Sequence, residues 1–388
     1  MTVSMDKSKK NKVRVLHVFS GVGGGISSII LNLTENKTDD FIYDMLSFSY
    51  EGGEMFCSRV AACGATCYTM PRPRIEGMKV FFDYLDDFFS KHYYDAVHCH
   101  ISGWRAKPFS KYARKHGVKH FFIHAHTTKY DSRIDRIPLV KRMNQAINYN
   151  LADCYFTCSD LAADYIFGKK YLKKKHLAFV PNGINENLFK MAIADDKVGK
   201  YRLEFNIQDG YTVLGHVGRF SVPKNHDEVL NIAKNLKDKK YKFVLLLVGV
   251  GERFEEIKSK AHDMKLDGNI RFVGYRTDIC ELMKFFDVMI LPSLYEGLPT
   301  VAVECQASGT RIFLSDTITH QCDMQLGLAS FLPLNDTSKW VDEITSNRII
   351  KKNPGECVTH IASMGFTALS VGMNYCRELE RILSINGE

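Results

Sequence analysis

Short apolar runs alternate with longer amphipathic stretches along most of the chain. In the first half the apolar runs span residues 13–19, 41–48, 96–100, 121–124, 154–158 and 177–180, and in the second half they span 212–217, 243–249, 270–273, 288–291 and 311–314. Hydrophobicity is continuous within each run, which is typical of strands that are buried on both faces. The pattern therefore predicts two parallel β-sheets, each covered by helices on both sides.

The two halves repeat the same rhythm, so we expect two doubly wound α/β domains with Rossmann-like topology. A Pro-Asn-Gly turn at residues 181–183 interrupts the pattern and marks the boundary. We expect a flexible basic tail at 1–12, an N-terminal domain at 13–185, a C-terminal domain at 186–365, and a final helix at 366–388 that packs back on the N-terminal domain. Because ligands bind at the carboxyl ends of strands in such sheets, chemistry is expected in a deep cleft between the two facing domains.

Composition narrows the class of protein. Hydrophobic residues make up 45% and charged residues 25% of the 388 positions, as in a globular protein. No apolar run approaches the roughly 20 residues that span a bilayer, and the run after the basic N-terminus is too short for a signal peptide. We therefore expect a cytoplasmic protein whose 11 cysteines are thiols, since none has the CxxC spacing of a zinc site.

The formal net charge of +8 is concentrated in part in local runs, such as residues 72–79 and 168–176. Such runs are either solvated surface or an attraction to a phosphate-rich partner, which could be nucleic acid, anionic lipid or a diphosphate substrate. No nucleic-acid recognition motif accompanies the charge, so nucleic acid is not expected as a partner.

The first predicted strand runs into a glycine-rich stretch, SGVGGGISS. Gly23 and Gly24 allow a sharp turn and a close approach of the backbone to a ligand at the start of the next helix. The stretch differs from a dinucleotide-binding fingerprint, because Ile26 occupies the position of the third glycine. A tight structural turn and a phosphate or sugar contact both remain open here.

The second domain opens with a strand that ends at Gly218. Arg219 and Lys224 follow on the loop before the next helix. Arginine offers a rigid pair of donors and lysine a mobile point charge, which suits a clamp on a diphosphate. As ordinary surface residues they would need no ligand, so the prediction depends on their position at the carboxyl end of a strand.

Two glutamates, Glu296 and Glu304, flank a Gly-Leu-Pro turn in LYEGLPTVAVECQASGT. Pro299 fits the start of a helix, and the amides of Gly297 and Leu298 are available to bind an anion or a sugar hydroxyl. Acidic residues near a helix start could simply balance the dipole, which would explain one glutamate. A pair of carboxylates could also hydrolyse a glycoside, but such an enzyme needs no basic clamp.

These motifs occur in order with several others: CSD followed by IFGKK, VPNGIN, VGRFSVPKNH, LLLVGVGE, RFVGY, LPSLYEGLP and ECQASGT. Together they resemble the family-4 retaining glycosyltransferases, which have the GT-B fold. The similarity extends from about residue 13 to residue 340. The branch that it resembles comprises bacterial transferases of exopolysaccharide and capsule assembly, judged by HAHT, CSDLAADYIFG and LSDTIT.

The resemblance implies a nucleotide-sugar donor, with a UDP-sugar favoured over a GDP-sugar, and no metal or other cofactor. The acidic DxD triplet of metal-dependent transferases is absent from the sequence. Arg219 and Lys224 would grip the diphosphate, Glu304 would accept hydrogen bonds from the ribose, and Glu296 would hold hydroxyls of the transferred sugar. The remaining implied donor-site residues are Gly23, Gly24, Gly218, Val273, Gly274, Gly297, Leu298 and Pro299, with Val273 and Gly274 beside the nucleobase.

A histidine is also implied near the donor sugar, and we match it to His126 in HAHTTKY. Lone histidines are often structural, and His98 and His100 in VHCH compete for the role. The resemblance thus predicts a retaining glycosyltransferase that acts on a glycan, such as a lipid-linked polysaccharide precursor. In the family that the chain resembles, the N-terminal domain handles the acceptor. Because both basic runs fall in this domain, we expect peripheral attachment to the inner face of the cytoplasmic membrane. An epimerase of nucleotide sugars and a non-catalytic binding partner in an assembly complex are the alternatives.

Overall fold

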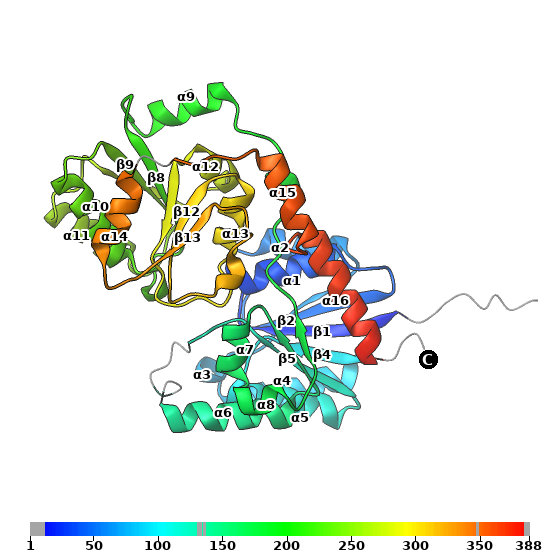
Figure 1. Cartoon of the computed structure of the whole chain (residues 1–388). Coiled ribbons are helices and arrows are strands. Elements are labelled where there is room, and N and C mark those ends of the chain that lie inside the picture. Colours follow the sequence, from blue (N-terminus) through cyan, green and yellow to red (C-terminus); the bar gives the residue numbers. More distant parts are fainter. Residues whose placement is uncertain (1–11, 130–133, 135–136, 347–348, 384–388) are drawn as a thin grey trace, which may run out of the picture. The chain divides into compact units, whose positions relative to one another are not determined.

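The computed structural model describes residues 12–129, 134, 137–346 and 349–383. The tail expected at 1–12 lies outside the described residues, apart from Lys12. The chain forms two compact units, one made of Met1–Gly183 with Ala368–Glu388 and the other of Ile184–Thr367. Each unit is built around one β-sheet (Figure 1).

The sheet of unit 1 has seven parallel strands in the order β3-β2-β1-β4-β5-β6-β7. Strand β1 lies inside the sheet between β2 and β4, and the chain winds outward from it in both directions, as in a doubly wound fold. The strands are β1 (Val13–Phe19), β2 (Phe41–Ser47), β3 (Cys67–Thr69), β4 (Ala96–Cys99), β5 (His120–Ala125), β6 (Cys154–Thr157) and β7 (Leu177–Phe179).

Helices connect these strands, and the last helix of the chain joins the same unit. The helices are α1 (Gly25–Glu35), α2 (Glu54–Ala62), α3 (Pro73–Glu76), α4 (Met78–Lys91), η1 (Gly103–Ala106), α5 (Lys107–Lys115), α6 (Pro138–Leu151), α7 (Asp160–Ile166), α8 (Lys169–Leu172) and α16 (Ala368–Leu383). Helix α16 lies alongside α1 (Figure 1). Its residues Val371, Tyr375 and Leu379 recur every four positions, so they share one face of the helix, and all three are buried in the core.

The sheet of unit 2 has six parallel strands in the order β10-β9-β8-β11-β12-β13. They are β8 (Thr212–Val217), β9 (Phe243–Val248), β10 (Ile270–Gly274), β11 (Val288–Leu291), β12 (Arg311–Ser315) and β13 (Ala329–Leu332). The helices are η3 (Glu186–Leu188), α9 (Asp195–Glu204), η4 (Val222–Lys224), α10 (His226–Asp238), α11 (Phe254–Asp263), α12 (Ile279–Phe285), α13 (Thr300–Ala307), η5 (His320–Cys322), α14 (Thr337–Thr345) and α15 (Pro354–Ser363).

Every strand that the hydrophobic pattern predicts is present, with ends that differ by at most one residue. All six residues of β9 are buried, which explains why its hydrophobicity is continuous. The pattern missed β3 and β13, which are the outermost strands of their sheets. Both are short and only partly buried, so their residues carry a weak apolar signal.

Candidate functional site

In unit 2 the loops after β8 and β11 are joined by hydrogen bonds. Asn225 ends η4 in the left-handed conformation, with φ of 53°, and its Nδ2 donates a hydrogen bond to the Pro292 carbonyl at 3.0 Å. The amide of Leu294 donates to the Pro223 carbonyl at 2.8 Å. These bonds hold Lys224, at the end of η4, beside the loop that carries Glu296.

Lys224 and Glu296 form an ion pair. Lys224 Nζ donates to Glu296 Oε1 at 2.7 Å, and each side chain keeps 16% of its surface exposed. The Lys224 side chain runs against Gly218, where a Cβ would lie 3.1 Å from its Cδ and Cε. The structure therefore brings together three of the predicted residues, Gly218, Lys224 and Glu296.

Ser293 completes this group, and sequence reasoning missed it. Its hydroxyl donates to Glu296 Oε1 at 2.9 Å, the same oxygen that binds Lys224. Its carbonyl accepts hydrogen bonds from Ser315 Oγ at 2.5 Å and Thr317 Oγ1 at 3.1 Å, so the serine is tied to the end of β12. The available signal was its position, since it follows β11 closely at the carboxyl edge of the sheet.

Glu304 lies on α13, in the helix that follows the Gly-Leu-Pro turn. The helix begins at Thr300, and Pro299 is its N-cap. Pro299 therefore lies at the start of the helix, one position before its first turn. Burial raises the pKa of Glu304 to about 7, against a smaller lowering by the charge of Lys224. None of the described residues donates a hydrogen bond to the Glu304 carboxyl group, so it retains its full capacity to bind a ligand.

Gly297, Leu298 and Pro299 are buried between the two glutamates. They connect the loop that holds Glu296 to the helix that holds Glu304. The short, buried turn fixes the spacing of the two carboxyl groups, because its backbone has little room to move.

Arg219 does not join Lys224 in the structure. Its side chain is 72% exposed and pairs with Glu252 at 3.2 Å. No hydrogen bond or ion pair links it to Lys224 or Glu296 among the described residues. A clamp on a diphosphate by both cations therefore requires Arg219 to leave Glu252. Sequence reasoning did not single out Glu252, although it ends the glycine-rich stretch after β9.

Glycines allow the ends of β8, β9 and β10 to lie close together. Gly249 has φ of 137°, and a Cβ there would lie 2.1 Å from the Gly218 carbonyl oxygen. Its amide donates to the Gly274 carbonyl at 2.8 Å. Gly274, with φ of 74°, and Val273 are both partly exposed at the end of β10. The predicted residues Gly218, Val273 and Gly274 therefore belong to neighbouring strand ends.

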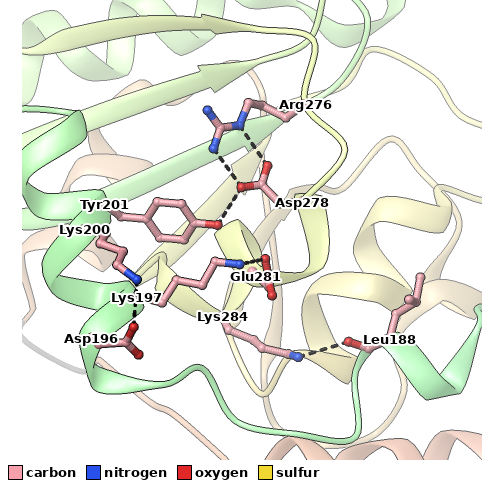
Figure 2. A network of polar contacts seen from close by, with 9 residues as sticks. All are labelled: Leu188, Asp196, Lys197, Lys200, Tyr201, Arg276, Asp278, Glu281 and Lys284. Carbon is pink, nitrogen blue, oxygen red and sulfur yellow. Dashed lines mark hydrogen bonds and ion pairs between the residues drawn. The ribbon is translucent and has the colours of Figure 1, made fainter.

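A polar network anchors the segment that follows Gly274. Figure 2 shows Tyr201 of α9 and Arg276 both directed at Asp278. Tyr201 Oη donates to Asp278 Oδ2 at 2.7 Å, and Arg276 donates to both carboxylate oxygens at 2.8 and 2.7 Å. These hydrogen bonds, that of Arg276 above all, lower the pKa of Asp278 to about 2. Because Asp278 accepts hydrogen bonds from both Tyr201 and Arg276, the segment after β10 is anchored to helix α9.

In unit 1, Gly23 and Gly24 form the exposed turn between β1 and α1. Gly23 has φ of 89°, which only glycine adopts readily, and Gly24 is the N-cap of α1. The amides of both glycines donate to Ser27 Oγ at 3.2 Å. An anion bound at this turn would have to compete with the Ser27 hydroxyl.

His126 belongs to a cluster of five histidines on one face of the sheet. The others are His17 on β1, His98 and His100 at the end of β4, and His124 on β5. Alternate residues of a strand point to the same face, which brings the five rings together. Burial lowers the pKa of all five, to about 3 for His17 and His126, so the rings are neutral at pH 7.

Three members of the cluster, His98, His100 and His124, have ligand atoms within 4.8 Å of one another. Sequence reasoning found no metal cage, because the three residues come from two separate strands. Two of them already bond to each other, with His98 Nε2 and His124 Nδ1 3.1 Å apart. Among the described residues, no carboxylate or thiol completes the group.

The fold and these strand-end residues are those expected of a glycosyltransferase. Comparison with known proteins supports this class. Residues 198–324 match the family described as "Glycosyl transferases group 1". The chain is 29% identical over 375 residues to the putative glycosyltransferase EpsF of Bacillus subtilis, covering 94% of each chain. It is 26% identical over 219 residues to a UDP-Gal:alpha-D-GlcNAc-diphosphoundecaprenol alpha-1,3-galactosyltransferase of Escherichia coli, covering 55% of this chain and 54% of that one.

Solved structures confirm the fold. The Anabaena protein HepE, in complex with UDP and glucose, superposes with a TM-score of 0.75 at 15% identity, over 95% of this chain and 100% of that one. A glycosyltransferase from Rickettsia africae gives a TM-score of 0.76 at 16% identity, over 97% and 100%. Residues 198–324 therefore match the group 1 glycosyltransferases, and the chain has the GT-B fold, as the sequence motifs predict.

Proposed function

We propose that the protein is a retaining glycosyltransferase that moves a sugar from a nucleotide-diphosphate donor, a UDP-sugar before a GDP-sugar, to a lipid-diphosphate-linked glycan. The observation that carries the proposal is the grouping of Lys224, Glu296 and Ser293 at the strand ends. On the next helix, the carboxyl group of Glu304 accepts no hydrogen bond from the described residues and can therefore accept hydrogen bonds from a ligand. The relatives with named substrates include two transferases that use diphosphoundecaprenol-linked acceptors.

The chemistry of the site in unit 2 suits such a donor. An ionised Glu304 accepts hydrogen bonds from the two adjacent hydroxyls of a ribose. Lys224 supplies positive charge for a diphosphate, and the same lysine positions Glu296 toward hydroxyls of the sugar. Arg219 is exposed and now pairs with Glu252. In the proposed complex it leaves Glu252 and binds the diphosphate, whose oxygens accept two parallel hydrogen bonds from the guanidinium.

In the proposed reaction the bond between the anomeric carbon and the phosphate oxygen breaks, and a bond from the acceptor oxygen to that carbon forms on the same face. The acceptor proton passes to the departing phosphate oxygen. Catalysis then consists mainly of stabilising the negative charge that grows on the diphosphate, which Lys224 and Arg219 do. Neither glutamate acts as a nucleophile in this scheme. No metal is needed for it.

Donor binding tests the site. Thermal shift with a panel of UDP- and GDP-sugars should raise the melting temperature for at least one donor, since a ligand that binds only the folded state stabilises it. Lys224→Met and Glu304→Ala should abolish the shift for that donor, and Arg219→Met should reduce it. Lys258→Met, which removes an exposed lysine on α11, and Glu255→Gln are the matched controls. Full donor binding by Lys224→Met and Glu304→Ala would contradict the assignment.

Transfer and its alternative are separated by omitting the acceptor. An epimerase converts its nucleotide sugar without a second substrate, whereas a glycosyltransferase leaves the sugar configuration of the donor unchanged. We expect no epimerised nucleotide sugar after prolonged incubation. If an epimerised nucleotide sugar appeared, the protein would be an epimerase, and the proposal of glycosyl transfer would be wrong.

We also propose that unit 1 attaches to an anionic membrane surface, where a lipid-linked acceptor resides. Among the described residues, no helix is both long and apolar enough to cross a bilayer. Helices α3, α4, α5, α6 and η1 pack side by side and expose apolar side chains among basic ones. The apolar members are Ile75, Met78, Val80, Trp104, Leu139 and Met143, and the basic ones include Arg72, Arg74, Lys79, Lys107, Lys111 and Arg142. This mixture suits a surface that lies at the lipid headgroups.

Charge reversal tests the attachment. Lys173 and Lys174 on the turn after α8 are exposed, but Lys175 is not a surface charge of the same kind, since its Nζ donates to the carbonyls of Tyr149 and Ala152. We expect Lys79→Glu with Lys111→Glu, or Lys173→Glu with Lys174→Glu, to reduce sedimentation with phosphatidylglycerol vesicles. Lys234→Glu with Lys258→Glu in unit 2 is the control. Undiminished sedimentation of both unit 1 variants would contradict the proposal.

A further inference from the structure

Three histidines of unit 1 form a continuous row of hydrogen bonds that ends at His126. His17 Nδ1 lies 3.0 Å from His100 Nε2, and His100 Nδ1 lies 2.7 Å from His126 Nε2. His17 is fully buried, His100 is nearly so, and His126 is partly exposed. The row therefore leads from the core of the unit to its surface.

The row couples the proton positions of its members. A neutral imidazole has one N–H donor and one acceptor nitrogen. If His17 donates from Nδ1, then His100 must accept at Nε2 and donate from Nδ1, and His126 must accept at Nε2 and carry its own proton on Nδ1. If the row runs the other way, all three rings carry their protons on Nε2. Only these two arrangements satisfy both hydrogen bonds.

The buried end of the row distinguishes the two arrangements. His17 Nε2 is buried and has no hydrogen-bond partner. In the second arrangement it would carry an unpaired N–H inside the core, whereas in the first it is an unpaired acceptor. Orphaned buried N–H groups are the rarer of the two in folded proteins. The first arrangement leaves the Nδ1 proton of His126 at the partly exposed end, where no described residue binds it.

A metal ion at His98, His100 and His124 is the other use of these rings. Such an ion would take ring lone pairs that now accept hydrogen bonds, including one of the His98–His124 pair and one of His100. It would also place a charge in a core where no described carboxylate or thiol joins the group to balance it. The hydrogen-bonded row accounts for His100 without either cost.

We infer that His17 and His100 are positioning residues that hold His126 as the Nδ1–H tautomer, so that His126 donates a hydrogen bond from Nδ1 to an oxygen of a substrate bound at the strand ends of unit 1 and cannot act as a base at that atom. The contact with the substrate rests on the proposed function, whereas the tautomer belongs to the chain alone. His126 would stabilise or orient that oxygen, such as a sugar hydroxyl.

Long-range ¹H–¹⁵N correlation spectra of the full chain, labelled at histidine nitrogens, test the tautomer directly at pH 7.5. The His126 signals are assigned by their loss in His126→Gln. We expect an unprotonated Nε2 and a protonated Nδ1 in the unsubstituted protein. A protonated Nε2 would overturn the inference.

Substitution of His17 tests the coupling. His17→Phe fills the site without a nitrogen, so we expect His126 to become a mixture of tautomers, with kcat for transfer reduced several-fold and KM little changed. His17→Asn keeps an amide donor near the Nδ1 position and should restore the Nδ1–H form. His98→Phe, a buried histidine outside the row, is the control for general disturbance. An unchanged tautomer in His17→Phe would contradict the coupling. If the expected tautomer is observed but His126→Gln transfers sugar at the full rate, the contact of His126 with the substrate is wrong, whereas the hydrogen-bonded row of histidines stands.

Discussion

Glu304 has surroundings unlike those of an ordinary surface carboxylate. Burial raises its pKa to about 7, and none of the described residues donates a hydrogen bond to it. About half of the molecules therefore carry a neutral carboxyl group at pH 7. A ribose that donates two hydroxyl hydrogen bonds favours the ionised form, because only a carboxylate accepts at both oxygens. Donor binding and proton release should thus be linked.

We predict that binding of a nucleotide sugar at pH 7 releases about half a proton, and that the dissociation constant rises roughly tenfold between pH 8 and pH 6. The dissociation constant rises toward acid pH because a larger fraction of Glu304 is then protonated, and the ligand must displace that proton in order to bind. Isothermal titration calorimetry in two buffers with different ionisation enthalpies measures the released proton.

Glu304→Gln provides the control for this linkage. The amide cannot ionise, so binding should become weaker and independent of pH in the same range. Proton release that persists undiminished in Glu304→Gln would assign the titration to another group and contradict the role of Glu304.

At the scale of elements, the site depends on loops that follow parallel strands and approach one another closely. Gly249 and Gly218 lie at adjacent strand ends, but a side chain would have different effects at the two positions. At Gly249 it would collide with the Gly218 carbonyl oxygen at 2.1 Å, in a backbone conformation with φ of 137°. At Gly218 its nearest neighbours would be atoms of the Lys224 side chain, at 3.1 Å, which can shift more easily than backbone.

We therefore predict that Gly249→Ala lowers the free energy of unfolding by about 3 kcal/mol or more, through strain and a backbone clash. Gly218→Ala should leave stability within about 1 kcal/mol of the unsubstituted protein and weaken donor binding, because it displaces Lys224. Urea denaturation followed by circular dichroism gives the first quantity, and calorimetry the second. Equal stability of the two variants would contradict this difference.

Sequence patterns predict the elements of this fold well, because long strands buried on both faces are continuously apolar. They also predict that Lys224 and Glu296 lie at strand ends, and the structure places the two side chains in contact there. The patterns do not reveal side-chain partners. The pairing of Arg219 with Glu252 and the bond from Ser293 to Glu296 depend on rotamers and on the positions of neighbouring loops.

The histidine cluster was hidden for a different reason. His17, His100 and His126 come from three strands that the sequence separates by many residues. The motifs single out His126 and His100, but they give no sign that His17 joins them. Only the strand order β1-β4-β5 makes them neighbours. A sequence alone does not give that order without an assumption about the fold.

At the scale of the whole molecule, the chain returns to its first unit through α16. Tyr375 is fully buried and its hydroxyl lies 2.6 Å from His98 Nδ1, while Val371 and Leu379 fill the same core. Burial of each such side chain contributes roughly 1.5–3 kcal/mol. The loss of all three would therefore be comparable with the net ~5–15 kcal/mol by which a typical domain is stable.

We predict that a chain truncated after Thr367 loses the folded state of unit 1, while unit 2 keeps its sheet, since α16 belongs to the first unit only. Amide ¹H–¹⁵N spectra would show dispersed signals from residues 184–367 alone. Truncation after Leu383 removes none of the described helix and should leave the spectrum of both units intact. Retention of native unit 1 signals without α16 would contradict the prediction.

The central claim is transfer with retention from a nucleotide sugar. The most direct measurement incubates the purified chain with the donor found by thermal shift and a polyprenyl-diphosphate-linked sugar, and determines the anomeric configuration of the new linkage by NMR. We predict a product with the same anomeric configuration as the donor, and none with Lys224→Met. A product of inverted configuration would contradict the proposed mechanism, and transfer at an unchanged rate by Lys224→Met would contradict the proposed site.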